Sequence, residues 1–177
     1  MKKAILLIMM LVSFCCNISA QTHLTFMGIP ITGTRKAMVT KLKAKGFTEK
    51  IQENDVGVEL KGTYLGKDVR LCVYNSNITK TVYLIDIFFK KGYFMDLYEQ
   101  YLDFREKFNG IYGKPTEILD ESFEEILEFG KLPMCATYYE SSKGLISLEI
   151  SEDKHCVEIS FQDKRNAEIM RKEKPQK

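Results

Sequence analysis

Histidine and cysteine are the residues whose chemistry is easiest to recognise in a sequence, and this chain offers little of it. Its two histidines are His23 and His155, so a serine or cysteine nucleophile would depend on one of them for activation. His155 adjoins Cys156, but neighbours on a strand point to opposite faces, so these two do not form a catalytic pair. The sequence also contains no glycine-rich phosphate loop, nucleophile elbow or zinc-binding histidine pair. We therefore expect a protein that is not an enzyme and uses no cofactor, with a carboxylate-only site as the catalytic alternative.

The first twenty residues have the three parts of a cleavable signal peptide. Lys2 and Lys3 give a positive start, residues 4–12 are an unbroken apolar run, and Ala20 before Gln21 fits the cleavage site. The apolar run is shorter than the ~20 residues that span a bilayer, and no comparable run follows. The pattern predicts export to the periplasm or the extracellular space, without a membrane span.

Cys15 and Cys16 raise the alternative of a lipid-anchored protein. A lipidated cysteine normally follows a small residue, whereas Cys15 follows Phe14 and Cys16 follows Cys15. The sequence therefore favours a free exported protein over a lipoprotein.

Cleavage would leave a chain with balanced charge and three cysteines. The full sequence has 26 basic and 24 acidic residues, and the loss of Lys2 and Lys3 leaves 24 of each. Such a chain offers no broad positive surface for nucleic acid. Cys72, Cys135 and Cys156 can form at most one disulfide among themselves, and their spacing matches no zinc motif.

Two segments could hold a metal ion. After cleavage His23 would be the third residue, where the new amine, two amides and the imidazole can surround Cu(II) or Ni(II). Against this site, Gln21 tends to cyclise and residues 24–27 have the composition of a strand. The other segment is the acidic stretch 116–133, but its carboxylates have helical spacing rather than the alternation of a calcium loop, so we expect a solvated helix face or loop there. These carboxylates are Asp120, Glu121, Glu124, Glu125 and Glu128.

The remainder is predicted to be a single α+β domain over residues 21–163, after the signal peptide at 1–20. It divides into two halves, about 28–90 and 93–163, each with a helix followed by three strands. Basic residues dominate 164–177, and we expect a flexible tail.

The two helices are indicated by their apolar spacing and by their ends. The first spans 34–45, with Met38 and Leu42 on one face and Gly46 at its end. The second ends near Gly113 and Pro115 and carries a wide stripe that is typical of a core-facing helix. The stripe residues are Phe94, Leu97, Tyr101, Phe104, Phe108 and Ile111.

Six strands are predicted, at 56–60, 69–73, 82–89, 134–140, 145–150 and 156–162. The strand at 82–89 is apolar on both faces, so we expect it near the centre of the sheet. Helices alternating with antiparallel strands predict a two-layer sandwich, with the helices on one face of the sheet in αβββ-αβββ order.

The other sheet face is the most useful candidate for a binding surface. By alternation we expect it to carry a mixed polar and aromatic set, a composition that suits a protein interface. The alternative is an ordinary solvated face. The set is Arg70, Cys72, Tyr74, Cys135, Thr137, Tyr139, Cys156, Glu158 and Ser160.

The start of the mature chain resembles a family of small uncharacterised exported proteins from gut Gram-negative anaerobes. The resemblance rests on residues 23–34, on 41–47 and on the Tyr-Gly-Lys-Pro sequence at 112–115. It implies an envelope or periplasmic location and an α+β fold, and it brings no established active site.

The αβββ-αβββ order is also similar to β-lactamase-inhibitor-like (BLIP-like) proteins and to small outer-membrane assembly lipoproteins. These resemblances imply binding through a sheet face, by analogy of fold alone. The sequence thus favours a non-enzymatic interaction protein of the cell envelope, whose partner is another envelope protein. A small-molecule or metal-binding protein, or a carboxylate-based enzyme, is the alternative.

Overall fold

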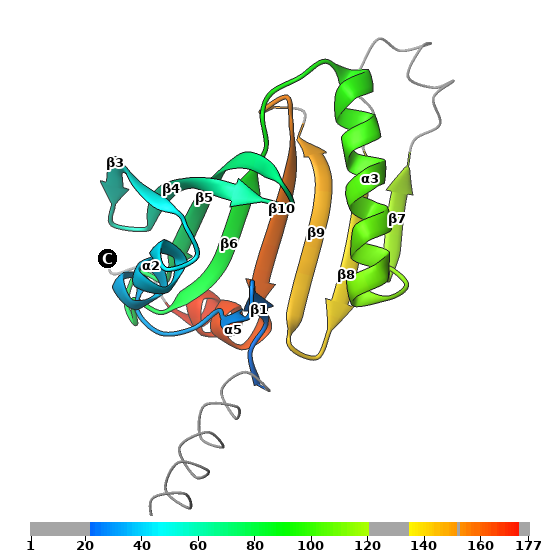
Figure 1. Cartoon of the computed structure of the whole chain (residues 1–177). Helices are drawn as coiled ribbons and strands as arrows, with labels where there is room; N and C mark the ends of the chain where they lie inside the picture. Colours follow the sequence, from blue (N-terminus) through cyan, green and yellow to red (C-terminus); the bar gives the residue numbers. More distant parts are fainter. Residues whose placement is uncertain (1–21, 121–134, 152, 174–177) are drawn as a thin grey trace, which may run out of the picture.

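The structure is a computed structural model that describes residues 22–120, 135–151 and 153–173. These residues form an eight-stranded antiparallel sheet with α2 and α3 packed on one face (Figure 1). The predicted α+β class and two-layer arrangement are confirmed. The predicted signal peptide and most of the acidic stretch lie outside the described residues. None of the helices in the described ranges is both long and apolar enough to cross a membrane.

The described elements follow one another along the chain as two short strands, a helix, four strands, a longer helix, four more strands and a last helix. They are β1 (Thr25–Phe26), β2 (Ile29–Pro30), α2 (Arg35–Lys43), β3 (Thr48–Asn54), β4 (Gly57–Tyr64), β5 (Lys67–Asn75), β6 (Val82–Phe88), α3 (Phe94–Tyr112), β7 (Glu117–Asp120), β8 (Cys135–Ser141), β9 (Gly144–Ser151), β10 (Cys156–Asp163) and α5 (Lys164–Lys172).

The sheet consists of two four-stranded meanders joined at its centre. The strand order is β3-β4-β5-β6-β10-β9-β8-β7, and β6 pairs antiparallel with β10 where Ile87 faces Ile159. Each half therefore has one strand more than predicted. The additional strands, β3 and β7, are the two edges of the sheet. They lack a clear apolar alternation, since Ile51 is the only aliphatic residue of β3 and β7 has four residues.

Helix α2 follows the sequence prediction closely. Thr34 caps its first turn by accepting a hydrogen bond from the backbone N–H of Ala37 at 3.3 Å. Met38 and Leu42 are buried. Gly46 has φ +96°, a left-handed conformation, and lets the chain turn so that Phe47 packs back into the core.

Helix α3 buries most of its predicted stripe. Leu97, Tyr101, Phe104 and Phe108 are almost fully buried. Ile111 is an exception, because it is 63% exposed and so does not belong to the core. The helix ends at Gly113, whose φ of +83° stops helical continuation.

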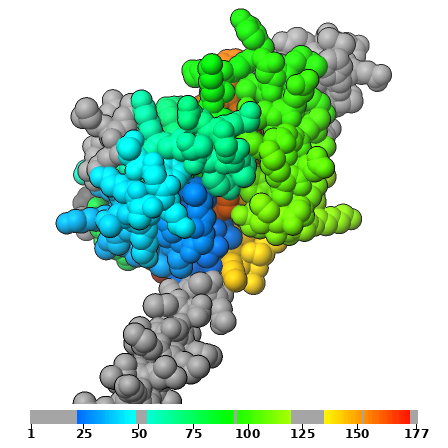
Figure 2. Space-filling view, in the orientation of Figure 1, coloured from blue at the N-terminus to red at the C-terminus, as the bar shows by residue number. Residues whose placement is uncertain are grey.

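The space between α2 and α3 is filled by the β1–β2 hairpin. Figure 2 shows these blue residues between the cyan and green parts of the chain. Phe26 is fully buried there, with its ring centroid 5.1 Å from the centroids of both Tyr64 and Phe161. The hairpin therefore completes the helix layer and joins the two halves of the core.

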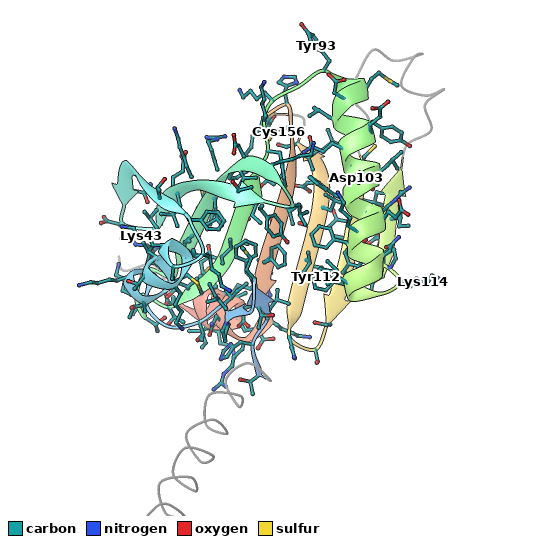
Figure 3. The ribbon with its side chains drawn as sticks, in the orientation of Figure 1. Lys43, Tyr93, Asp103, Tyr112, Lys114 and Cys156 are labelled. Carbon is teal, nitrogen blue, oxygen red and sulfur yellow. The ribbon has the colours of Figure 1, made fainter. Side chains whose placement is uncertain are left out.

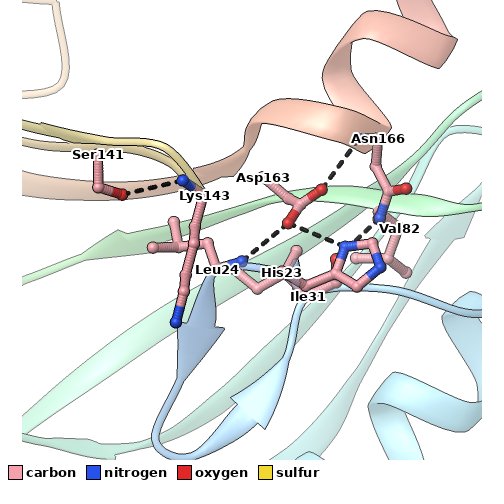
Figure 4. Close-up of polar contacts among 8 residues, drawn as sticks. All are labelled: His23, Leu24, Ile31, Val82, Ser141, Lys143, Asp163 and Asn166. Carbon is pink, nitrogen blue, oxygen red and sulfur yellow. Dashed lines mark hydrogen bonds and ion pairs between the residues drawn. The ribbon is translucent and has the colours of Figure 1, made fainter. Parts of the chain in front are cut away.

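A buried carboxylate, Asp163, fixes the hairpin to the end of β10 (Figure 4). Its Oδ2 accepts hydrogen bonds from the backbone N–H of Leu24 at 2.8 Å and lies 3.1 Å from Nδ1 of His23. Its Oδ1 accepts from the N–H of Asn166 at 2.9 Å, which caps helix α5. One side chain with no solvent exposure thus joins the hairpin segment to the start of α5.

The residues after β10 were expected to be a flexible basic tail, and over 164–172 this prediction is wrong. They form α5, in which Asn166 and Ala167 are buried. The amide of Asn166 donates hydrogen bonds to the carbonyls of Ile31 and Val82, at 2.9 and 3.0 Å. The helix is therefore attached both to the hairpin segment and to the start of β6.

We expect Asp163→Asn to lower the free energy of unfolding by about 2–4 kcal/mol, because a neutral amide cannot accept all three donors around a buried carboxylate. Urea denaturation followed by circular dichroism measures the change. The matched control is Asp103→Asn, which removes an exposed ion pair with Lys107 and should cost less than about 0.5 kcal/mol. Equal effects of the two variants would contradict the role given to Asp163.

Two glycine substitutions provide a second test, one of the packing of Phe47 on the sheet and one of the helix α3. A methyl group at Gly62 would overlap the ring of Phe47, so Gly62→Ala should destabilise the protein by about 1–3 kcal/mol. Gly110 lies within α3, and within the described part of the chain an added methyl meets no atom closer than 4 Å. Gly110→Ala should therefore stabilise by up to about 1 kcal/mol. Thermal unfolding of both variants gives the sign of each effect.

Candidate functional site

The face of the sheet opposite α2 and α3, here called the outer face, carries a compact group of polar and charged side chains. The strand register places them in two neighbouring rows across the middle strands. One row is Arg70, Phe88, Glu158 and Glu149, and the other is Cys72, Asp86, Ser160 and Ser147. We call the group formed by Arg70, Cys72, Tyr74, Asp86, Phe88, Glu149, Lys154, Glu158 and Ser160 the outer patch.

The predicted binding-face residues divide between the two faces. Arg70, Cys72, Tyr74 and Glu158 lie on the outer face, as expected. The assignment of the β8 residues was wrong. Alternation shows which residues share a face but not which face that is, and β8 pairs with β9 so that Cys135, Thr137 and Tyr139 point to the helix side.

Hydrogen bonds to α3 hold the β8 side chains on that side. Thr137 is fully buried, with its Oγ1 2.6 Å from the hydroxyl of Tyr101. The hydroxyl of Tyr139 donates to the side chain of Asn109 at 2.9 Å. These two residues therefore belong to the core between sheet and helix and are not available to a partner.

Phe88 lies at the centre of the outer patch between two cations. The Nζ of Lys154 is 4.1 Å from the centroid of its ring, and the guanidinium carbon of Arg70 is 5.5 Å from it. Lys154 also donates to Oε2 of Glu158 at 2.8 Å. Phe88 is only 5% exposed, and both cationic side chains lie against its ring.

Asp86 is the most perturbed carboxylate of the patch. Burial raises its pKa to about 6, a hydrogen bond from the Ser160 hydroxyl at 2.7 Å lowers the pKa in part, and the nearby charge of Glu158 raises it again. Burial followed by the charge of Glu158 also raises the pKa of Glu149. The outer patch thus contains carboxylates that are poorly hydrated, and its own positive charges are those of Arg70 and Lys154.

Cys72, Cys135 and Cys156 are not joined in disulfides. The side chains of Cys72 and Cys156 lie on the outer face of the sheet, whereas Cys135 lies on the helix side. Burial raises the pKa of both Cys72 and Cys156, so each thiol stays protonated at neutral pH and is a poor nucleophile.

The two histidines lie in different surroundings. His23 is buried, and its Nδ1 is occupied by Asp163, which disfavours the metal site expected at the mature N-terminus. His155 lies exposed in the turn between β9 and β10, with φ +50°. No group of three or more histidine, cysteine, aspartate or glutamate side chains is arranged to hold a metal ion within residues 22–120, 135–151 and 153–173.

Three of the hollows lined by described residues have linings that do not include Asp86, Glu149 or Glu158. Two adjoin each other near the end of β6, where Asp68, Phe89, Lys90 and Lys91 line both, with volumes of about 700 and 420 Å³. The larger of the two also reaches Arg70, so a basic rim borders one side of the outer patch. The third, of about 610 Å³, lies beside α2.

Several residues of the outer patch were not singled out from the sequence. Asp86 lies within a strand that reads as apolar on both faces, and a lone carboxylate in such a strand is the signal that could have identified it. Lys154 lies in the turn between β9 and β10. Its contact with Phe88 depends on the pairing of β6 with β10, which are far apart in sequence.

No protein-family model matches this chain, and no curated protein and no solved structure is detectably similar to it.

The pKa of Asp86 leads to a prediction about stability and pH. The folded protein keeps this proton to about pH 6, whereas an unfolded chain loses it near its ordinary pKa of 3.8. Between these values the folded state binds more protons, so the contribution of Asp86 to the free energy of unfolding falls as pH rises, by on the order of 2 kcal/mol. Asp86→Asn should remove this fall and keep the bond from Ser160.

Urea denaturation at pH 4.5 and pH 7.5 measures the difference for the parent protein and for Asp86→Asn. The control is Asp103→Asn, whose carboxylate is exposed and should leave the pH dependence as in the parent. An Asp86→Asn protein that loses as much stability over this range as the parent would show that Asp86 does not have a raised pKa.

Proposed function

We propose that this protein is a non-enzymatic binding protein of the cell envelope that holds a protein partner on its outer patch. In this proposal the chain is exported by its signal peptide and acts as a free protein in the periplasm or outside the cell. The partner is another envelope protein. The proposal rests on one observation, the burial of ionisable groups on a sheet face that neither α2 nor α3 covers.

That observation matters because burying a charge is unfavourable unless something compensates for it. Asp86 is 9% exposed and Glu158 is 6% exposed, although both lie on the outer face. A face that needed only to be soluble would keep its carboxylates in water. Ionisable groups held out of water at a surface are more typical of a site prepared for a ligand.

The outer patch also has the composition and order of an interface. An aromatic residue, Phe88, lies at its centre, and charged side chains surround it. Arg70 and Lys154 are already held against the ring, so a partner that contacts them costs less side-chain entropy than one that must order them.

Enzymatic action through these carboxylates is the rival hypothesis. A carboxyl group with a pKa of about 6 could donate or accept a proton near neutral pH. We favour binding because the linings of the three hollows described above do not include Asp86.

The test is chemical crosslinking and pull-down from native envelopes, with the full exported protein and two matched variants. The outer variant combines Arg70→Glu with Glu149→Lys, and the control combines Lys114→Glu with Glu99→Lys at exposed positions in or next to α3. Each pair conserves net charge. We expect the parent and the control to recover the same partner and the outer variant to lose at least about tenfold of it.

Circular dichroism of the outer variant first establishes that it folds. Loss of the partner in the control but not in the outer variant would place the interface on the helix side and overturn the proposal. Recovery of no reproducible partner, with a small molecule copurifying instead, would overturn it as well.

A further inference from the structure

The charges of the outer patch change sign from one side of the sheet to the other. In one row across the patch, a cation lies on β5 at one end and a carboxylate lies on β9 at the other, with β6 and β10 between them. The residues of this row are, in order, Arg70, Phe88, Glu158 and Glu149. Arg70 and Glu149 therefore lie one strand away from the central β6–β10 pair, on opposite sides of it.

These two end residues are the charges of the row that are least satisfied within the chain. Glu158 already accepts a hydrogen bond from Lys154 at 2.8 Å. Among the residues that the structure describes, Glu149 has neither a hydrogen bond nor an ion pair. The side chain of Arg70 is 45% exposed, and the 3.8 Å between its guanidinium and Glu59 exceed hydrogen-bond length. Its donors therefore remain available to a carboxylate from outside the chain.

A second copy of this chain presents the complementary order of charges. Most homodimers are related by a two-fold axis, so that every contact between two different residues occurs twice. An axis between two facing sheets, parallel to the strands and midway between β6 and β10, places β5 of one copy opposite β9 of the other. Arg70 then faces Glu149 of the second copy. An axis across the strands would instead place β5 opposite β5 and would separate Arg70 from Glu149.

The other outer residues near the axis are compatible with this arrangement. In the same row, Phe88 with Lys154 over its ring faces Glu158 of the second copy. In the neighbouring row, Asp86 faces Ser160 of the second copy. Within these two rows the carboxylates of one copy therefore do not face those of the other, and the arrangement avoids like-charge repulsion.

Half-buried side chains supply apolar surface around these charges. They lie on the outer face by the strand register and are Tyr74, Leu84, Tyr138 and Leu145. Removal of apolar surface from water drives most protein association, and charge pairs mainly determine how the surfaces align. Two sheets that pack face to face lie about 10 Å apart, a separation that long side chains such as arginine and glutamate can bridge.

We propose that the outer patch holds a second copy of this chain in a two-fold symmetric dimer, with the sheets face to face and Arg70 of each copy paired with Glu149 of the other. The dimer goes beyond the function proposed above and does not depend on it, because it forms without any other protein. An envelope partner on the same face would displace the second copy.

Sedimentation velocity of the purified exported protein tests the dimer. We expect a monomer–dimer equilibrium with a Kd of at most about 50 μM at about 50 mM salt, weakened at least about fivefold at about 500 mM salt because salt screens the exposed charges. A protein that is still monomeric at about 500 μM would overturn the proposal.

Two single substitutions test the contact between Arg70 and Glu149. Arg70→Glu and Glu149→Lys each turn both symmetry-related contacts into repulsions, so each variant alone should dimerise at least about tenfold more weakly than the parent. An equimolar mixture of the two variants should dimerise to within about threefold of the parent, because both contacts of the mixed dimer again join opposite charges. Single variants that dimerise like the parent, or a mixture that stays monomeric, would overturn the contact.

The control variants are Lys114→Glu and Glu99→Lys, which change the net charge by the same amounts. Glu99 is an exposed residue of α3 and Lys114 lies at the C-terminal end of that helix, which packs on the other face of the sheet (Figure 3). Each control should dimerise like the parent. Equal loss of the dimer in the controls would mean that net charge governs association and would overturn the contact.

The outer variant of the pull-down experiment, which combines Arg70→Glu with Glu149→Lys, separates this proposal from the proposed function. It restores both dimer contacts with the charges exchanged, so it should dimerise like the parent while it loses the envelope partner. Circular dichroism establishes that it folds. A folded outer variant that stays monomeric would overturn the dimer, whatever the pull-down recovers.

Discussion

The carboxylate of Asp163 is the constraint around which the rest of this fold is arranged. Its two oxygens serve the N-terminal hairpin and the first turn of α5, and Asn166 then reaches the hairpin segment and the start of β6. A buried charge is tolerated only when its acceptors are satisfied. The segments that supply the donors must therefore lie together at the end of β10. The position of the hairpin between α2 and α3 follows from this requirement and from the burial of Phe26.

Completion of the helix layer determines which part of the molecule can meet a partner. Because the hairpin fills the space between α2 and α3, the helix side of the middle strands is committed to the core. The outer face carries a mixture of polar, charged and aromatic residues, in which Phe88 lies between two cations and Asp86 accepts a hydrogen bond from Ser160.

Apolar periodicity predicted the helices and strands that have a regular apolar pattern, and it predicted little of the rest of the structure. The stripe of α3 and the alternation of β5 and β9 were sufficient to place them. Edge strand β3 and helix α5 were missed because their residues are mostly polar, and their stability comes from pairing and from the cap at Asp163. The predicted orientation of β8 was wrong because both sides of this strand carry polar as well as apolar residues. The hydrogen bond between Thr137 and Tyr101 shows which side faces α3. The outer patch was found only in part, since Asp86 and Lys154 join it through pairing across the two halves.

The contact between His23 and Asp163 also has a consequence for the time course of folding. It joins residues 140 positions apart, so the last native interactions form only when nearly the whole chain is present. Closing such a large loop is entropically costly, and chains dominated by distant contacts fold slowly. The hairpin therefore docks late in folding, after β10 and α5 are in place to receive it.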